Sequence, residues 1–235
     1  GLAVPSGDRL TLSKGKSKYK YIFSLLLIMG GYHFVKNVLI SLIHKFKKKA
    51  NQFNLVKDPT IIGYAKDNNI PTYKIDNPNN KEFRETLIKL KPDIIINQSQ
   101  SIIKKDLLNI PSIGVLNRHN ALLPKNRGRL TPFWVLFKEE KETGVSIHFV
   151  EEGLDSGDII VQKKFKVGKK DSFNSLVKKN YEIAPKAMLE AISLLESNQE
   201  EFISNDDNIA TYNSTPSLKE AWSYRVKIGL GFNKL

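Results

Sequence analysis

Two polar side chains with the chemistry of an acid–base site, Asn117 and His119, stand two positions apart directly after the apolar residues 112–116. The apolar stretch reads as a buried strand, and if strand geometry continues, both side chains project to the same side. A neutral imidazole can accept a proton from a nucleophile, and an amide NH2 group can donate to a developing oxyanion. Because ligands bind at the carboxyl ends of strands in open α/β sheets, we expect a ligand site here.

A carboxylate on a short loop is the next candidate. Gly153 and Gly157 frame Asp155 in a tight connection. A carboxylate beside a histidine orients the ring and stabilises its protonated form. The alternative is structural, because Asn and Asp are common turn residues that bond to their own backbone. Spacing alone leaves both interpretations open, and it predicts His148, inside an alternating strand, to be a packed or edge residue.

A helix N-terminus is predicted between these stretches, at the same edge of the sheet. Thr131 is its expected cap, and Pro132 lies in its first turn. Arg127 and Arg129 stand just before it and could meet an anionic substrate. We therefore take Arg127, Gly128 and Arg129 as candidate substrate-binding residues.

The elements that must position these residues alternate from Pro59 onward, which is typical of an α/β fold. The pattern predicts helices over residues 59–68, 81–90, 102–108 and 172–195, strands over 72–75, 93–97 and 112–116, and an antiparallel pair over 144–150 and 158–165. Pro59 is expected in the first turn of its helix. The apolar run 93–97 is expected in a strand covered on both faces. Pro185 is expected to kink the long helix or to split it in two.

The composition excludes several kinds of site. The chain has 235 residues, 40% of them hydrophobic and 26% charged, as in ordinary globular proteins. It has no cysteine, which excludes a disulfide framework, a thiolate zinc site and a cysteine nucleophile. The four histidines include no pair at helical ligand spacing, so we predict no metal site.

The formal net charge of +13 is concentrated at the N-terminus. Residues 1–50 hold ten Lys or Arg and one acid, a balance of +9, and the other 27 basic and 23 acidic residues leave only +4. Solvated lysines that flank an apolar helix are the favoured interpretation, and long-range attraction to a polyanion is the alternative.

The apolar run of residues 22–29 is too short for a membrane span, which needs about 20 apolar residues. Gly30 and Gly31 interrupt the run, and no small-residue cleavage site follows it as a signal peptide would require. We therefore predict two packed helices separated by the glycine pair and no transmembrane segment. A peripheral membrane contact is the alternative.

Four motifs occur in an order that resembles the folate-dependent formyltransferase family. They are Asn117-x-His119, Leu122-Leu123-Pro124-x-x-Arg127-Gly128, Thr143-Gly144-Val145 and Gly153-Leu154-Asp155-x-Gly157-Asp158. The resemblance spans residues 59–195. This family includes methionyl-tRNA formyltransferase, glycinamide ribonucleotide transformylase and the nucleotide-sugar N-formyltransferases.

The resemblance implies a Rossmann-like α/β domain, with a mostly parallel sheet and an antiparallel addition. It also implies formyltetrahydrofolate as co-substrate, no metal, and Asn117, His119 and Asp155 as the catalytic trio. An amine would attack the formyl carbon, and His119, or a water held by Asp155, would move the amine proton toward the folate nitrogen. The residues that would hold the pterin, largely through backbone groups, are Ile96, Gln98, Gln100, Val150, Gly153 and Leu154.

The beginning of the chain departs from the family pattern, in which a strand, a helix and a second strand come first. Residues 1–5 match the end of that second strand, so we hypothesise an N-terminally truncated chain that lacks its first strand. Residues 1–50 would then be a basic helical segment inserted after the second strand, 51–198 the catalytic domain and 199–235 a short tail. Asn120 and residues 97–100 also differ from the family's usual residues.

A nucleotide-linked amino sugar is the favoured acceptor, because the residues after Leu195 are too few for the second β domain of the tRNA enzyme. The alternatives are a methionyl-tRNA formyltransferase-like activity, a formyltetrahydrofolate hydrolase, and a catalytically silent folate- or nucleotide-binding protein. We expect a cytoplasmic protein with a small-molecule amine substrate. Candidate surfaces for a homodimer are the apolar N-terminal helices and the tail aromatics Trp222, Tyr224 and Phe232.

Overall fold

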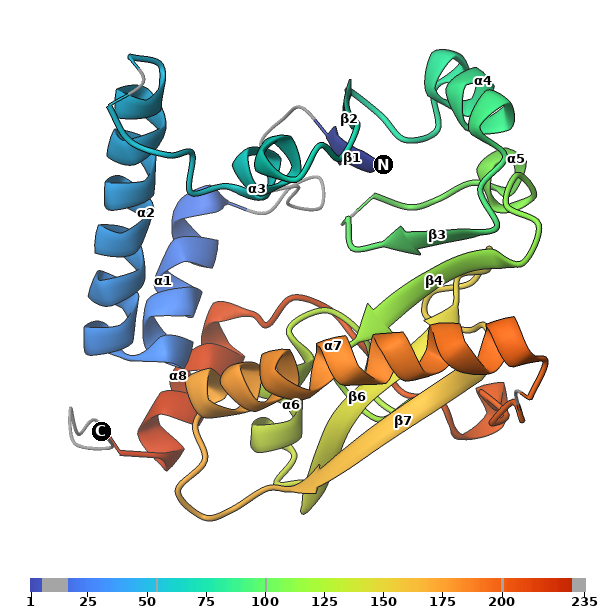
Figure 1. The fold of residues 1–235 in the computed structure, drawn as a ribbon. Coiled ribbons are helices and arrows are strands. Elements are labelled where there is room, and N and C mark those ends of the chain that lie inside the picture. Colours follow the sequence, from blue (N-terminus) through green and yellow to red (C-terminus); the bar gives the residue numbers. More distant parts are fainter. Residues whose placement is uncertain (6–16, 54, 100, 200, 230–235) are drawn as a thin grey trace.

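The computed structural model describes residues 1–5, 17–53, 55–99, 101–199 and 201–229 (Figure 1). In chain order the elements are β1 (Leu2–Pro5), α1 (Lys18–Met29), α2 (Gly31–Asn51), α3 (Ile61–Asp67), β2 (Thr72–Ile75), α4 (Lys81–Leu90), β3 (Ile94–Asn97), α5 (Lys105–Leu108), β4 (Gly114–His119), β5 (Arg127–Gly128), α6 (Thr131–Phe137), β6 (Glu142–Phe149), β7 (Ile159–Lys166), α7 (Phe173–Ser197), the 3-10 turn η1 (Asp207–Ile209), β8 (Tyr212–Asn213) and α8 (Leu218–Lys227). The α/β class predicted from the sequence is confirmed.

The described strands pair in three separate sheets. β1 pairs with β2 and β5 with β8, both in parallel, while a four-stranded sheet has the order β3-β4-β6-β7. Within that sheet β3 and β4 are parallel, and β6 and β7 add to β4 in antiparallel fashion. The antiparallel addition predicted from the alternating residues is therefore confirmed.

The prediction that β3 is covered on both faces is wrong. Ile96 in β3 is 47% exposed, whereas Leu116, its partner in β4, is completely buried. The reason is position: β3 lies at the edge of the four-stranded sheet, while α7 packs on β6 and β7. The apolar run therefore predicts a strand here, but it does not show how far the covering helix α7 extends across the sheet.

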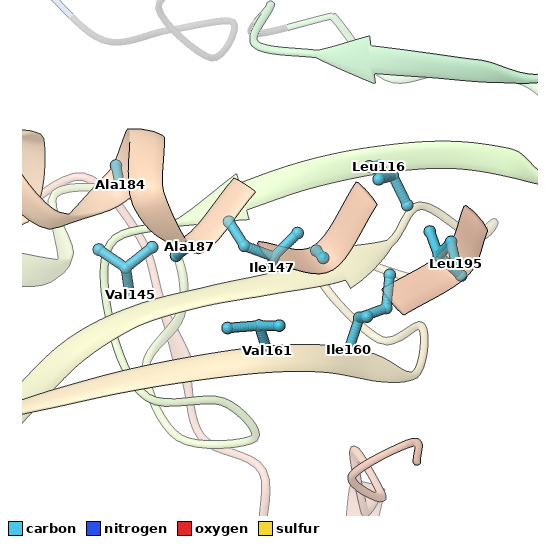
Figure 2. Packing of buried hydrophobic residues seen from close by; sticks show 9 residues of the cluster. Leu116, Val145, Ile147, Ile160, Val161, Ala184, Ala187 and Leu195 are labelled. Carbon is cyan, nitrogen blue, oxygen red and sulfur yellow. The ribbon is translucent and has the colours of Figure 1, made fainter. Parts of the chain in front are cut away.

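The main core lies between α7 and the four-stranded sheet (Figures 1 and 2). Ala184, Ala187 and Ala191 recur at helical spacing and are buried, so α7 turns a face of small side chains to the sheet. Ile147 on β6 and Val161 on β7 pack against this face. Small side chains on the helix and branched ones on the strands let the two layers interlock at native density.

The helix α7 continues through Pro185, so of the two predicted effects, a kink or a split, the split into two helices does not occur. Proline lacks the N–H that would bond to the carbonyl of Tyr181, four residues earlier. Both Pro185 and Tyr181 are exposed. Water can therefore satisfy that carbonyl, and the helix does not have to end.

A second core joins the two ends of the chain. Leu27 and Ile28 of α1 pack with Phe133 of α6 and Tyr224 of α8. Arg225 of α8 reinforces this contact, because its guanidinium donates to the carbonyl oxygens of Leu27 (2.5 Å) and Ile28 (3.3 Å). These carbonyls belong to the last turn of α1 and have no partner within the helix.

The tail aromatics do not form the exposed surface that the sequence suggested. Tyr224 is only 2% exposed, because it faces the second core, and its assignment to an exposed surface is wrong. Trp222 is 51% exposed. Phe232 lies outside the described residues.

The predicted break between two N-terminal helices is confirmed. Gly30 has φ +83° and ψ 155°, a backbone conformation that favours glycine, and α1 and α2 meet there at 119°. No single described helix is long and apolar enough to cross a membrane. The two helices together meet that criterion of length and composition as a bent pair.

Three predicted helix starts shift. α3 begins at Ile61 rather than at Pro59, because Thr60 caps it by accepting from the Gly63 N–H (3.3 Å). Only Lys105–Leu108 is helical within the predicted 102–108. Thr131 is not the cap of α6, because its hydroxyl donates to the Asn120 carbonyl (2.8 Å) and Leu130 holds the cap position.

Replacing Ile147 with alanine should lower the free energy of unfolding by about 2–5 kcal/mol, since the buried side chain would leave a cavity between α7 and the sheet. Urea denaturation measures this loss. Ile209→Ala is the control, because Ile209 is 56% exposed and its truncation should cost little. Equal losses in the two variants would contradict the assigned core.

Candidate active site

The strand β4 divides its side chains between the two faces of the sheet. Leu116 points into the core beneath α7, and Val115 belongs to the cluster formed with α4 and α5. Strand alternation places Asn117 and His119 on the same face as Val115. The sequence prediction that the two polar side chains share one face therefore agrees with the geometry.

The ring of His119 is held through Nε2 and is 5% exposed. Its Nε2 lies 2.8 Å from the Asn126 carbonyl oxygen, which can only accept, so Nε2 carries a hydrogen and donates. Its Nδ1 lies 3.5 Å from the Asp155 carboxylate oxygen Oδ2. In the neutral ring Nδ1 is then the free base, and a proton taken up there would lie beside a carboxylate.

Asp155 is presented to His119 by a strained and heavily bonded loop. Its φ of +50° is in the left-handed region, which is uncommon outside glycine. The Gly128 N–H donates to its Oδ2 at 2.8 Å. The Asn205 side-chain amide donates to the carbonyl oxygens of Asp155 (2.9 Å) and Gly157 (2.8 Å), which fixes the loop backbone. The structure therefore brings the three residues of the predicted trio together.

Arg127 does not face a substrate as predicted. Its side chain is completely buried, and its guanidinium donates to Asp207 (2.6 Å), to the Tyr212 hydroxyl (2.7 Å), and to the backbone and side-chain oxygens of Asn205 (2.9 and 2.8 Å). Arg127 thus holds Asn205, and Asn205 holds the loop of Asp155. This is a positioning role, and it explains why a charged residue is buried here.

Gly128 and Arg129, the other two predicted substrate contacts, continue from this buried arginine. Gly128 contributes its N–H to Asp155, as described above. Arg129 is exposed, and its backbone N–H donates to the Asn213 carbonyl (3.0 Å). Of the three, Arg129 alone presents its side chain on the surface near the site.

His148 is a site residue that the sequence pattern did not reveal. It is packed, as predicted, at 1% exposed, but β6 pairs it directly with Asn117 of β4. Its Nδ1 lies 2.7 Å from the Phe149 carbonyl oxygen and therefore donates. Its Nε2 then accepts from the Asn117 amide at 3.4 Å and lies 3.8 Å from Asp155. The sequence pattern does not give the strand register that pairs His148 with Asn117, so it could not place His148 in the site.

The electrostatics of His148 agree with this assignment. Burial, together with the neighbouring His119, lowers the pKa of His148 from 6.5 to about 4, and this outweighs the opposing effect of Asp155. A neutral ring keeps Nε2 as an acceptor. His148 can therefore hold the Asn117 amide at neutral pH.

The Asn117 amide is oriented from two sides. Its Oδ1 accepts from the Gln98 side chain (3.3 Å), and one amide hydrogen is directed at His148. An amide NH2 group has two hydrogens, so the second can donate to a bound substrate. Gln98, predicted as part of the pterin pocket, thereby contacts Asn117.

The other predicted folate contacts differ in what they can offer. Strand alternation points the Ile96 side chain to the α7 face, opposite Asn117, so only its backbone can face the site. The Val150 N–H already donates to the Val115 carbonyl (2.7 Å). Gly153 and Leu154 are exposed on the loop just before Asp155. Gln100 lies outside the described residues.

These groups fit a folate better than a metal. The exposed Leu154, 55% accessible, offers an apolar surface beside the backbone groups of its loop, and a flat heterocycle is bound by surfaces of this kind. Within the described ranges, no group of three His, Asp or Glu side chains is arranged to hold a metal ion.

Gly128→Ala should destabilise the fold by at least about 1 kcal/mol. Gly128 has φ +105°, and an added Cβ would collide with the Asn213 carbonyl oxygen. Thermal unfolding measures the loss. Gly168→Ala is the control, because its Cβ would meet only Asp171, at 3.5 Å. Equal stability of the two variants would contradict the described pairing of β5 with β8.

The free energy of unfolding should fall as the pH drops from 6.5 to about 4, because the unfolded chain then binds a proton at His148 that the folded chain does not. This contribution, on the order of 3 kcal/mol, is complete above pH 6.5 and should be missing in His148→Gln. Urea denaturation across this pH range compares that variant with the unchanged chain and with His44→Gln, whose ring is exposed. Parallel pH profiles for all three would refute the low pKa.

Known proteins are similar to this chain in both sequence and fold. A family model described as formyl transferase matches residues 25–192, beginning inside α1 and therefore upstream of residue 59. Methionyl-tRNA formyltransferase of Kosmotoga olearia is 32% identical over 193 residues, which cover 80% of this chain and 61% of that protein. The bifunctional polymyxin resistance protein ArnA of Wigglesworthia glossinidia brevipalpis is 42% identical over 111 residues, covering 47% of this chain and 17% of that protein.

A solved structure extends the comparison to the fold. The N-formyltransferase from Helicobacter canadensis, in complex with folinic acid and dTDP-3-aminofucose, superimposes with a TM-score of 0.55 at 23% identity. The superposition covers 66% of this chain and 54% of that one. The chain thus spans less than two thirds of each relative named here. The family match covers most of the chain, and this chain belongs to the formyl transferase family.

Proposed function

We propose that this chain transfers the formyl group of formyltetrahydrofolate to a primary amine. The observation that carries the proposal is the fixed ring of His119, which donates from Nε2 to Asn126 and turns Nδ1 toward Asp155. A base held in this way, beside an oriented amide on the same strand face, matches the needs of acyl transfer. Membership of the formyl transferase family supports the same reaction.

Each residue has a distinct part in the proposed reaction. As the amine nitrogen bonds to the formyl carbon, negative charge develops on the formyl oxygen, and the second amide hydrogen of Asn117 donates to it. His119 takes the amine proton at Nδ1, where the Asp155 carboxylate balances the charge. The same proton then passes to the folate nitrogen as the bond between that nitrogen and the formyl carbon breaks. No proton is gained or lost overall.

A nucleotide-linked amino sugar is the proposed acceptor. The structural neighbour from Helicobacter canadensis is described in complex with dTDP-3-aminofucose, which is a nucleotide-linked amino sugar. After α7, Asn205 holds both Arg127 and the backbone of Asp155, and β8 pairs with β5, so this segment supports the Asp155 loop. The exposed Arg129, just before α6, is the residue that we propose to bind a phosphate of this acceptor.

Methionyl-tRNA is the second candidate acceptor. The relative from Kosmotoga olearia carries that activity in its name and aligns with 80% of this chain. The strongly basic N-terminal residues could also attract a polyanion. The two acceptors differ so much in size that a direct assay separates them.

The proposal is tested by following release of tetrahydrofolate with a dTDP-linked amino sugar, with methionyl-tRNA and with water alone. His119→Ala, Asn117→Ala and Asp155→Asn should each lower kcat/KM by about 10²–10⁴-fold, because each removes a group that acts on the reacting atoms. Folate affinity of His119→Ala should stay within a few-fold of the unchanged chain. His44→Ala, an exposed histidine on α2, is the control and should retain full activity.

Each acceptor gives a distinct outcome. Release with the amino sugar supports the favoured acceptor, and release with methionyl-tRNA alone replaces it with the second. Release with water alone identifies a hydrolase. Folate binding without release from any acceptor, or full activity of His119→Ala, would overturn the proposed function.

A further inference from the structure

The helix α2 carries an apolar stripe that the described fold leaves uncovered. No residue of α2 is buried. Its large apolar side chains recur at intervals of three and four residues, which places them along one side of the helix. The stripe consists of Tyr32, Val35, Val38, Leu39, Leu42, Ile43 and Phe46, and each of these is at least 44% exposed. A continuous apolar surface of this length marks an interaction site.

The charged side chains of α2 itself are all lysines, while Asp58, outside the helix, lies near Lys48. Between Asp8 and Asp58 the sequence has no acidic residue. By helical spacing, Lys36 and Lys47 lie along one edge of the stripe and Lys45 along the other, and Lys48 and Lys49 follow in the last turn. Lysines in these positions can extend their charged ends sideways while their stems cover apolar surface. A partner for this surface must therefore be both apolar and anionic.

The other described residues leave the stripe of α2 exposed. α1 lies between α2 and α8, and the core contacts of the pair come from Leu27 and Ile28 of α1 (Figure 1). In Figure 1, α2 stands at the outer edge of the molecule. The 119° bend at Gly30 sets α2 off from α1, which is itself tied to α8 by Arg225. α2 is therefore an exposed helix attached to α1, which its contacts with α8 hold in place.

We propose that α2 docks this protein onto the surface of an anionic lipid bilayer. A helix with an apolar stripe and flanking lysines lies in the plane of the bilayer surface, with the stripe among the acyl chains and the lysines at the headgroups. The aromatic side chains Tyr32 and Phe46 stand near the two ends of the stripe, and amphipathic aromatic rings such as tyrosine favour the membrane–water interface. The acid-free sequence supplies the attraction to anionic headgroups.

This docking is independent of the formyl transfer proposed above. The stripe contributes no residue to the site of His119 and Asp155, so either proposal can fail alone.

Vesicle flotation with the full chain tests the proposal. Vesicles of phosphatidylcholine alone are compared with vesicles that also contain about 30% phosphatidylglycerol, a composition that provides the negative surface potential. We expect binding only to the anionic vesicles and release by 0.5 M NaCl, roughly the ionic strength at which surface charges are screened within a few ångströms. Leu39→Glu with Phe46→Glu should weaken binding at least about 10-fold, because both side chains would enter the acyl region.

The charged edge is tested separately. Lys45→Gln with Lys47→Gln, one residue from each edge, should weaken binding at least about 5-fold. Lys178→Gln with Lys186→Gln on α7 is the matched control for charge, and Leu189→Glu, at 67% exposed on α7, is the control for the apolar pair. All substituted side chains are exposed, so circular dichroism should show an unchanged fold.

Four outcomes of the vesicle assay would overturn the proposal. They are absence of binding to anionic vesicles, equal binding to neutral vesicles, retention on vesicles at 0.5 M NaCl as expected for an inserted span, and equal loss of binding in the control variants. If light scattering shows a dimer that Leu39→Glu with Phe46→Glu dissociates, the stripe belongs to a second copy. If gel shift shows tRNA bound by the same lysines while vesicles are not, the partner is a nucleic acid.

Discussion

The buried guanidinium of Arg127 is the contact on which the active-site geometry depends. A charge removed from water needs hydrogen-bond acceptors, and Asn205, Asp207 and Tyr212 accept from its two terminal nitrogens, from a segment about 80 residues further along the chain. The same Asn205 holds the backbone of Asp155, whose carboxylate faces His119. The segment after α7 thus helps to hold the candidate site, because Asn205 bonds to both Arg127 and Asp155.

The three polar side chains of the site, Asn117, His119 and His148, have different hydrogen-bonding roles. His119 donates from Nε2 and offers a base at Nδ1, while His148 donates from Nδ1 and offers an acceptor at Nε2. The depressed pKa of His148 keeps its ring neutral, so its Nε2 can accept from the Asn117 amide. Two histidines within one site can therefore have different tasks: His148 orients the Asn117 amide, and His119 is the base that we propose to move a proton.

The apolar and basic helix α2 and the active site occupy different parts of the molecule. The second core, built from α1, α6 and α8, connects the two regions, since Phe133 and Tyr224 pack against Leu27 and Ile28. The same core joins the early and late parts of the chain. α1 is therefore packed into the folded domain, although it lies far in sequence from the proposed catalytic residues. A helix presented on such a support can be placed at a surface without disturbing the site.

The sequence by itself determined the α/β class, most strands and helices, the glycine break at Gly30, and the pairing of Asn117 with His119 on one strand face. These features follow from local periodicity and from backbone preferences of single residues. Only the tertiary structure decided that Arg127 is buried, that His148 enters the site, and that α7 runs through Pro185. Each of these depends on strand register, on which strands a helix covers, or on a partner distant in sequence, and local patterns do not encode such choices.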